Sequence, residues 1–237
     1  MPVRLSPQGP STLQSGLVAA LPIALGYFPI AFSFGVAASR AGLTAPEAVA
    51  MSVIIYAGAS QFLALALFSS GAPVLVAAFA LIAMNLRHVL YAPALLRAAG
   101  RDASTRAAWA WAFGLTDEVF GAALGALARG QRFSEGYMFG LGLGAYAAWI
   151  GGTAAGALAG GGALEAWPAV NAGLGFMLPA LFLALLLSIL TRRQVPVIAV
   201  AGAVTVAVTL AATSTAGILA GMVAGALTGV LWRRGRA

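Results

Sequence analysis

The chain has 237 residues, of which 61% are hydrophobic and only 8% are charged, and its mean hydropathy is +0.95. Several apolar runs exceed the roughly 18–20 residues needed to cross a hydrocarbon core about 30 Å thick, which excludes a soluble domain. The formal net charge of +7 comes from arginines grouped between the apolar runs, as in the loops of membrane proteins. The sequence therefore predicts an all-α, polytopic helical membrane protein with about seven to eight spans.

The residue inventory argues against an enzyme and against a metal protein. The chain has no cysteine, one histidine and six acidic residues. Disulfides, thiol catalysis and thiolate metal sites are thereby excluded, and few other metal sites can be assembled. Nothing indicates a cofactor, and no basic patch with interleaved aromatic residues indicates nucleic acid.

Residues 1–15 are polar and contain three prolines, and we interpret them as a cytoplasmic N-terminal tail. The first span is expected at about residues 16–38, and it is expected to stay uncleaved because no signal-peptidase pattern follows it. Pro22, Gly26 and Pro29 fall on one helical face. Prolines there predict a kink or break, and irregular backbone at membrane depth must face protein or a cavity.

The second span is expected at about residues 45–68, where Thr44 and Glu47 form a capping box at its start. Within it, Tyr56 and Ser60 are spaced four residues apart, and Gln61 follows directly. The amide of Gln61 needs hydrogen-bond partners at mid-membrane. The small residues at 57–60 are equally typical of close helix packing, so both interpretations stay open.

The third span, about residues 74–96, contains Asn85, Arg87, His88 and Tyr91 in the middle of an apolar run. A charge near the centre of a membrane helix costs roughly 2.5–3.5 kcal/mol on insertion scales, so Arg87 should face protein or water. A lone histidine is often only a satisfied core residue. Three polar neighbours within one turn instead favour a functional role.

The fourth span, about residues 107–128, carries the adjacent acids Asp117 and Glu118 on a face lined by glycines. Two acids in an apolar run need cations, protons or water. Arg87 and His88 are the ionisable groups available in neighbouring spans. We therefore expect the third and fourth spans to face each other, with Arg87 paired to Asp117 or Glu118.

The remaining apolar runs predict spans at about 136–158, 168–190, 195–212 and 215–232, so residues 16–232 are expected to form one transmembrane domain before a basic tail at 233–237. Residues 62–65 and 182–185 are both Phe-Leu-Ala-Leu, which either marks an internal repeat or is chance. Eight spans with the N-terminus inside place Arg97, Arg101 and Arg106 outside, against the positive-inside rule. A re-entrant or broken segment in the first half would explain this.

Four motifs carry a family resemblance: Gly-Tyr-Phe-Pro at 26–29, Ala-Gly-Ala-Ser-Gln-Phe at 57–62, Asn-Leu-Arg-His-Val-Leu-Tyr at 85–91 and Leu-Thr-Asp-Glu-Val-Phe at 115–120. Through them the chain, from about residue 16 to residue 232, resembles the AzlC family of branched-chain amino acid exporters. The resemblance implies a multi-pass protein of the bacterial inner membrane that works with a small membrane subunit of the AzlD family. It also implies export of branched-chain or similar small apolar amino acids.

A zwitterionic substrate needs an anion site, a cation site and an apolar pocket. The N-termini of broken helices suit a carboxylate, and the expected breaks lie at 22–29 and 58–61. Asp117 or Glu118 is the candidate for the ammonium group, and His88 or a buried carboxylate is the candidate for proton coupling. The full set of expected substrate or proton pathway residues is Asn85, Arg87, His88, Tyr91, Asp117, Glu118, Ser60, Gln61, Tyr56, Gly26 and Pro29.

Three alternatives remain. A channel for small solutes can be built from the same half-helices, and a non-transporting scaffold subunit would share the composition. An intramembrane hydrolase would need Ser60 and His88, but no nucleophile-elbow pattern surrounds Ser60. The sequence therefore favours a transporter over an enzyme.

Overall fold

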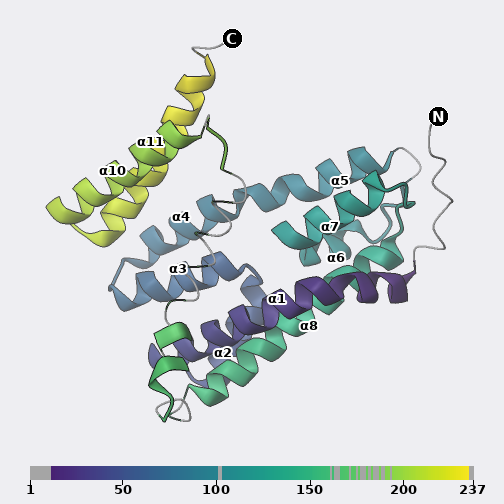
Figure 1. Cartoon of the computed structure of the whole chain (residues 1–237), viewed down its shortest axis with the longest axis horizontal. Coiled ribbons are helices and arrows are strands. Elements are labelled where there is room, and N and C mark those ends of the chain that lie inside the picture. The colour runs from purple at the N-terminus through teal and green to yellow at the C-terminus, as the bar shows by residue number, and fades with distance from the viewer. Residues whose placement is uncertain are drawn as a thin grey trace. The chain divides into compact units, whose positions relative to one another are not determined.

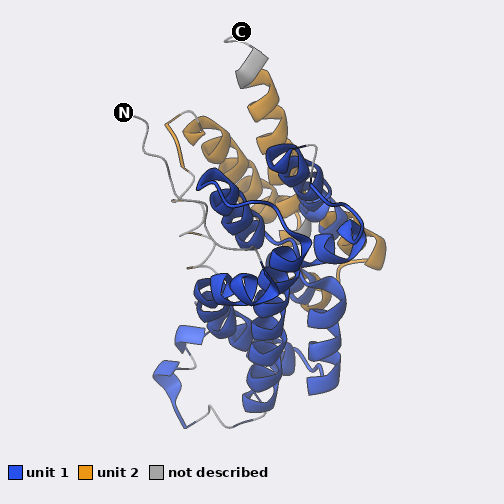
Figure 2. Ribbon diagram, turned by 90° about the vertical axis from the view of Figure 1, so that its right-hand side faces the viewer, with its two compact units in different colours: residues 1–65, 81–177 blue, residues 66–80, 178–237 orange. Residues whose placement is uncertain are grey.

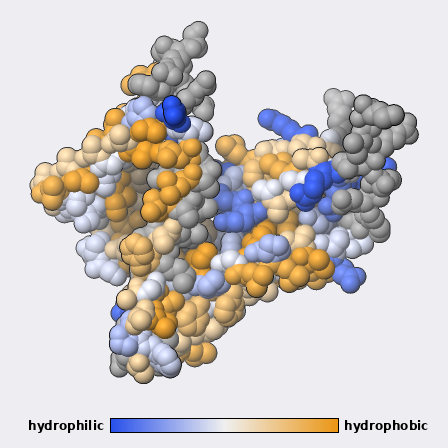
Figure 3. Space-filling view, in the orientation of Figure 1, coloured by the Kyte–Doolittle hydropathy of each residue, from blue (hydrophilic) through white to orange (hydrophobic). Residues whose placement is uncertain are grey.

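A computed structural model describes residues 12–100, 103–160 and 194–234, together with scattered positions between 162 and 192. The described residues are helical and contain no strand, and three helices are long and apolar enough to cross a membrane: Leu13–Arg40, Val74–Ala99 and Glu135–Ala159. Apolar side chains cover much of the visible surface (Figure 3). The predicted class, an all-α polytopic membrane protein, is confirmed.

The chain divides into two compact units, which Figure 2 shows in different colours. Unit 1 comprises residues 1–65 and 81–177, and unit 2 comprises residues 66–80 and 178–237. The polar residues singled out in the sequence all belong to unit 1. Each unit is therefore described by itself.

Two long helices, α1 (Leu13–Arg40) and α8 (Glu135–Ala159), lie side by side and form the central helix pair of unit 1 (Figure 1). They run parallel, because Gly140 faces the backbone of Leu13 and Gly156 faces the backbone of Phe32. Glycine permits this close approach where any side chain would clash. The predicted break at 22–29 is wrong: α1 stays helical through both prolines, and its packing along α8 supports it on either side of them.

The second predicted span is two helices, α2 (Ala45–Ile55) and α3 (Gly58–Ser69), which are joined by a turn and form a hairpin. The predicted capping box of Thr44 and Glu47 is present at the start of α2. Helix α2 runs antiparallel to α8, because Ser52 contacts Thr153 and Tyr56, at the end of α2, contacts Tyr146. After this tip the chain turns back, since Phe62 packs on Phe34 near the C-terminal half of α1.

The third predicted span is α4 (Val74–Asn85), the 3₁₀ segment η1 (Leu86–Leu90) and α5 (Tyr91–Ala99). The polar motif of the sequence thus lies where the regular α-helix is interrupted. Beyond the interruption, α5 runs beside α7, and Leu95 reaches the N-terminal part of α8 near Met138. The C-terminal end of α5 therefore lies at the same end of unit 1 as the start of α8.

The fourth predicted span is also a hairpin, formed by α6 (Ala108–Trp111), η2 (Ala112–Gly114) and α7 (Asp117–Ala128). It begins beside Glu135, whose carboxylate accepts hydrogen bonds from Ala107 N–H and from the indole of Trp111. Its tip at Thr116 reaches Tyr27 in the middle of α1. From there α7 returns to the start of α8, so this hairpin enters from the end opposite to that of α2–α3.

Unit 2 contains the antiparallel helices α10 (Val195–Ala211) and α11 (Ser214–Arg234). They pack closely because Gly217 and Gly221 face Thr209 and Thr205. The helices predicted at 195–212 and 215–232 are confirmed. Most of the span predicted at 168–190, the tail at 1–11 and the last residues of the tail at 233–237 lie outside the described residues, and so does the second half of the suspected repeat.

Candidate functional site

The tip of the α6–α7 hairpin meets η1 and the start of α5 at a group of polar and charged side chains. Arg87 in η1 and Asp117 at the first residue of α7 form an ion pair, with 2.8 Å between Nη2 and Oδ2. The Tyr91 hydroxyl donates a hydrogen bond to the other carboxylate oxygen of Asp117. The predicted pairing of the third and fourth spans is therefore present. Both charged side chains are 46% exposed, so the pair borders an open space rather than a sealed core.

Glu118 lies beside this pair but has a different partner. The Tyr27 hydroxyl from α1 donates to a Glu118 oxygen and lies 2.6 Å from the hydroxyl oxygen of Thr116. The side chain of Thr116 also caps α7 by accepting from Val119 N–H. Two acids in the first turn suit the positive end of the helix dipole. The helix is interrupted at Leu115 and Thr116, between η2 and α7, and this interruption places both carboxylates at mid-length of α1 and α8.

Tyr56 occupies the tip of the opposing hairpin in a strained conformation. Its φ of 24° and ψ of 50° lie in the left-handed region, which L-residues other than glycine rarely adopt. Its ring packs edge-on against Tyr146 at 4.7 Å and lies 6.2 Å from the ring of Phe113. Only 6% of the residue is exposed, and its hydroxyl has no hydrogen-bond partner among the described residues.

A buried chain of hydrogen bonds fixes the α2–α3 hairpin to α8. The indole N–H of Trp149 donates to Gln61 Oε1 over 2.8 Å, and Gln61 Nε2 donates to Ser52 Oγ over 2.9 Å. The Ser52 hydroxyl pairs in turn with that of Thr153 at 2.7 Å. The amide of Gln61 therefore has the partners that its depth requires. The geometry gives Gln61 an anchoring position.

Asn85 connects the other polar residues of the third span. Its Oδ1 accepts from the Ser60 hydroxyl at 3.0 Å, and its backbone carbonyl lies 3.2 Å from His88 Nδ1. The His88 ring also packs edge-on against Tyr91. The described residues show no hydrogen bond between Ser60 and His88, which a serine hydrolase would require. The geometry gives the hydrolase alternative no support.

Two expected residues stand apart, and two important ones were missed. Gly26 and Pro29 are exposed on α1 and take no part in the hydrogen-bond networks formed among the described residues. Tyr27, between them, is buried and contacts Glu118 directly. Tyr27 is part of the motif at 26–29, but the sequence does not show which residue of this motif faces inward. Trp149 was likewise indistinguishable from other membrane tryptophans.

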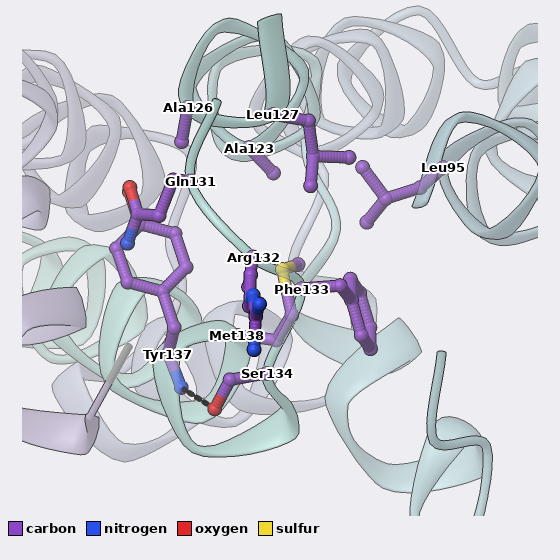
Figure 4. A pocket seen from close by; sticks show the side chains of 10 residues that line it. All are labelled: Leu95, Ala123, Ala126, Leu127, Gln131, Arg132, Phe133, Ser134, Tyr137 and Met138. Carbon is purple, nitrogen blue, oxygen red and sulfur yellow. Dashed lines mark hydrogen bonds between the residues drawn. The ribbon is translucent and has the colours of Figure 1, made fainter. Parts of the chain in front are cut away.

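A pocket between α5, α7 and α8 lies at the N-terminal end of α8 (Figure 4). Leu95, Leu127, Phe133 and Met138 make most of its wall apolar. Its volume leaves room for about one water molecule, so it is too small for an amino acid. Among the described residues no group of three histidine or acidic side chains could hold a metal ion.

Comparison with known proteins places these features in a family. The model of the AzlC protein family matches residues 22–162, which include both hairpins. The inner membrane protein YgaZ of Escherichia coli strain K12 is 45% identical over 187 residues, covering 78% of this chain and 76% of that protein. An uncharacterized membrane protein of Archaeoglobus fulgidus is 41% identical over 191 residues, covering 81% of this chain and 82% of that protein.

A further relative, an uncharacterized membrane protein of Helicobacter pylori strain J99, is 31% identical over 167 residues and covers 69% of each chain. No solved structure matches. The relatives are membrane proteins, and the apolar helices agree with a multi-pass location in the plasma membrane. On the family match and on the identity to YgaZ, the chain belongs to the AzlC family.

Proposed function

We propose that this protein is a secondary transporter that exports branched-chain or similar small apolar amino acids, with residues 16–232 acting as one transport domain. The main observation is that two hairpins enter unit 1 from opposite ends, and that Tyr27, which binds Glu118 of one hairpin, packs on Trp149, which binds Gln61 of the other. The Arg87–Asp117 ion pair is formed by the residue next to Glu118. Many secondary transporters bind substrate at the midplane, between discontinuous helices. Family membership supports a transport role of this kind.

The chemistry at the tips suits a zwitterion with an alkyl side chain. Asp117 and Glu118 supply negative charge, and Arg87 supplies positive charge. The first turn of α3 leaves backbone N–H groups free for a carboxylate, as at other helix N-termini. The rings of Phe113 and Tyr146 provide an apolar wall. His88 or one of the two carboxylates is the candidate group for proton coupling.

The hairpins also suggest an orientation. Arg97, Arg106, Arg129 and Arg132 belong to segments at the end of unit 1 where α1 and α8 begin, and Arg40 lies at the opposite end. By the positive-inside rule, the arginine-rich end faces the cytoplasm. This orientation removes the conflict that eight simple spans produced for Arg97 and Arg106, while Arg101 lies outside the described residues. It also keeps the N-terminal tail cytoplasmic.

Flux measurements test the proposal. The purified protein, alone and with a small AzlD-type subunit, is reconstituted into liposomes, and radiolabelled L-leucine and D-leucine fluxes are followed with and without an imposed pH gradient. Saturable, stereoselective flux that responds to the gradient is expected. Unsaturable flux without stereoselectivity indicates a channel, and no flux of any amino acid under either condition contradicts the proposal.

Arg97→Ala, which removes a charge at the end of α5, controls for general effects of charge. Unchanged flux in His88→Ala, Asp117→Asn and Glu118→Gln would remove these residues from proton coupling while leaving the transport proposal standing.

A further inference from the structure

We infer that Glu118, with the hydroxyl groups of Tyr56 and Tyr27, forms the site that receives the ammonium group of the substrate. This inference rests on the proposed function and deepens it, because it separates the roles of two adjacent acids. The three residues come from α7, from the tip of α2–α3 and from the middle of α1. The site is therefore formed where both hairpins meet the long helix.

Asp117 is already neutralised within the protein. Its two oxygens are taken by the Arg87 guanidinium and by the Tyr91 hydroxyl. Glu118 is also exposed, yet among the described residues it has no cationic partner and accepts only from the neutral hydroxyl of Tyr27. A carboxylate at membrane depth requires a cation, a proton or water. Glu118 is thus the acid left available for a positively charged ligand.

The unpaired hydroxyl of Tyr56 is the independent observation that indicates a ligand. Buried side-chain hydroxyls almost always have a partner, and this one has none among the described residues. Tyr56 belongs to the same buried cluster as Tyr27, and its ring lies 6.2 Å from that of Phe113, in the segment that leads into α7. A hydroxyl oxygen can accept a hydrogen bond, as a carboxylate can. An ammonium group, with three N–H donors, satisfies both groups together.

The surroundings hold this arrangement in place. Tyr27 packs edge-on against Trp149, with ring centroids 5.2 Å apart, and Trp149 is itself tied to Gln61. Gly58, two residues after Tyr56, is in direct contact with the Trp149 ring. The tip of the α2–α3 hairpin is thus fixed on the same tryptophan as Tyr27. Rigid aromatic support of this kind favours a preorganised binding site.

Ligand analogues and a single-atom variant test the site. Binding of L-leucine, of isocaproate, which lacks the ammonium group, and of isoamylamine, which lacks the carboxylate, is measured by thermal shift and radioligand competition on the purified full chain. Tyr56→Phe is expected to weaken L-leucine and isoamylamine about tenfold, the effect of losing one hydrogen bond to a charged group. Isocaproate binding should stay unchanged. Glu118→Gln should act in the same direction and more strongly.

The stability of the unliganded protein gives a second readout. Tyr56→Phe removes a hydroxyl that makes no hydrogen bond, so the apparent melting temperature without ligand should not fall. Tyr146→Phe is the matched control, because the Tyr146 hydroxyl donates to the Val53 carbonyl over 2.8 Å and its loss should lower the melting temperature. A merely structural Tyr56 would instead lower the melting temperature and weaken all three ligands alike.

The outcomes separate the site from the proposed function. If the wild-type chain, with and without the small subunit, binds and transports no amino acid, the proposed function fails and the site with it. If it binds L-leucine but Tyr56→Phe and Glu118→Gln bind it normally, only the site is overturned.

Repeating the assays in sodium, potassium and choline buffers detects a site for a coupling cation. In that case the variants would change the ion dependence and not the preference for an ammonium group, which also overturns the assignment.

Discussion

Arg87 and Asp117, which are 30 residues apart in sequence, form an ion pair at 2.8 Å between the interruption of the third span and the first residue of α7. Each side chain is 46% exposed, so the pair is not sealed inside the protein. Pairs of this kind contribute at most about 1 kcal/mol to folding. Its main role is therefore expected in positioning α7 and η1 for transport rather than in stability.

Exchanging the two charges tests this pairing. Arg87→Asp and Asp117→Arg, each alone, leave two like charges facing each other and should abolish most transport. The double variant restores opposite charges and should recover part of it, as measured by L-leucine flux in proteoliposomes. Arg97→Ala is the control for charge removal outside the pair. A double variant that folds normally but is as inactive as both single variants would contradict the pairing.

Gln61 should be essential for the stability of unit 1. Gln61→Leu leaves the buried indole N–H of Trp149 without its partner, which costs about 1–3 kcal/mol. It also removes one of the two hydrogen bonds of the Ser52 hydroxyl, which keeps its bond with Thr153. A clear fall in the melting temperature in detergent is expected. Ser70→Ala is the control, because the Ser70 hydroxyl bonds only to a carbonyl in its own turn. Equal melting temperatures for the two variants would refute the anchoring role.

The glycine contacts between α1 and α8 should tolerate no side chain. A Cβ at Gly156 would overlap the Phe32 carbonyl, whereas one at Gly151 would meet no atom within 4 Å. Gly156→Ala is expected to destabilise the protein by about 1–3 kcal/mol through overpacking. Gly151→Ala, in the same helix, should be neutral or slightly stabilising, because alanine favours helix more than glycine does. Thermal unfolding of both variants decides the matter.

The membrane orientation can be measured directly, because the chain has no cysteine. Single cysteines at the exposed positions Ala98 and Ala128 should react with an impermeant thiol reagent only from the cytoplasmic side. One at Ala41, at the end of α1, should react only from the outside. The comparison uses intact cells and inside-out vesicles. Reaction of Ala98→Cys from the outside would mean that α2–α3 crosses the membrane instead of returning.

The sequence by itself determined the class of this protein, the approximate position of α1, α8, α10 and α11, and the chemical identity of the central polar group. Apolar runs of membrane length and charges within them are visible without coordinates, because water and lipid impose them on any fold. For the same reason the pairing of Arg87 with Asp117 or Glu118 followed from the small number of ionisable partners.

Only the tertiary structure decided which spans are continuous. Prolines suggested a break in α1, which packing on α8 overrides. The expected break at 58–61 lies close to the observed one, since α3 begins at Gly58, whereas continuous hydrophobicity concealed the break at Thr116. A hairpin and a full span have the same composition, since both lie among apolar surroundings, and only the contacts with α1 and α8 reveal where the chain turns back. The tertiary structure also showed that Asp117, and not Glu118, pairs with Arg87, and that Glu118 accepts a hydrogen bond from Tyr27.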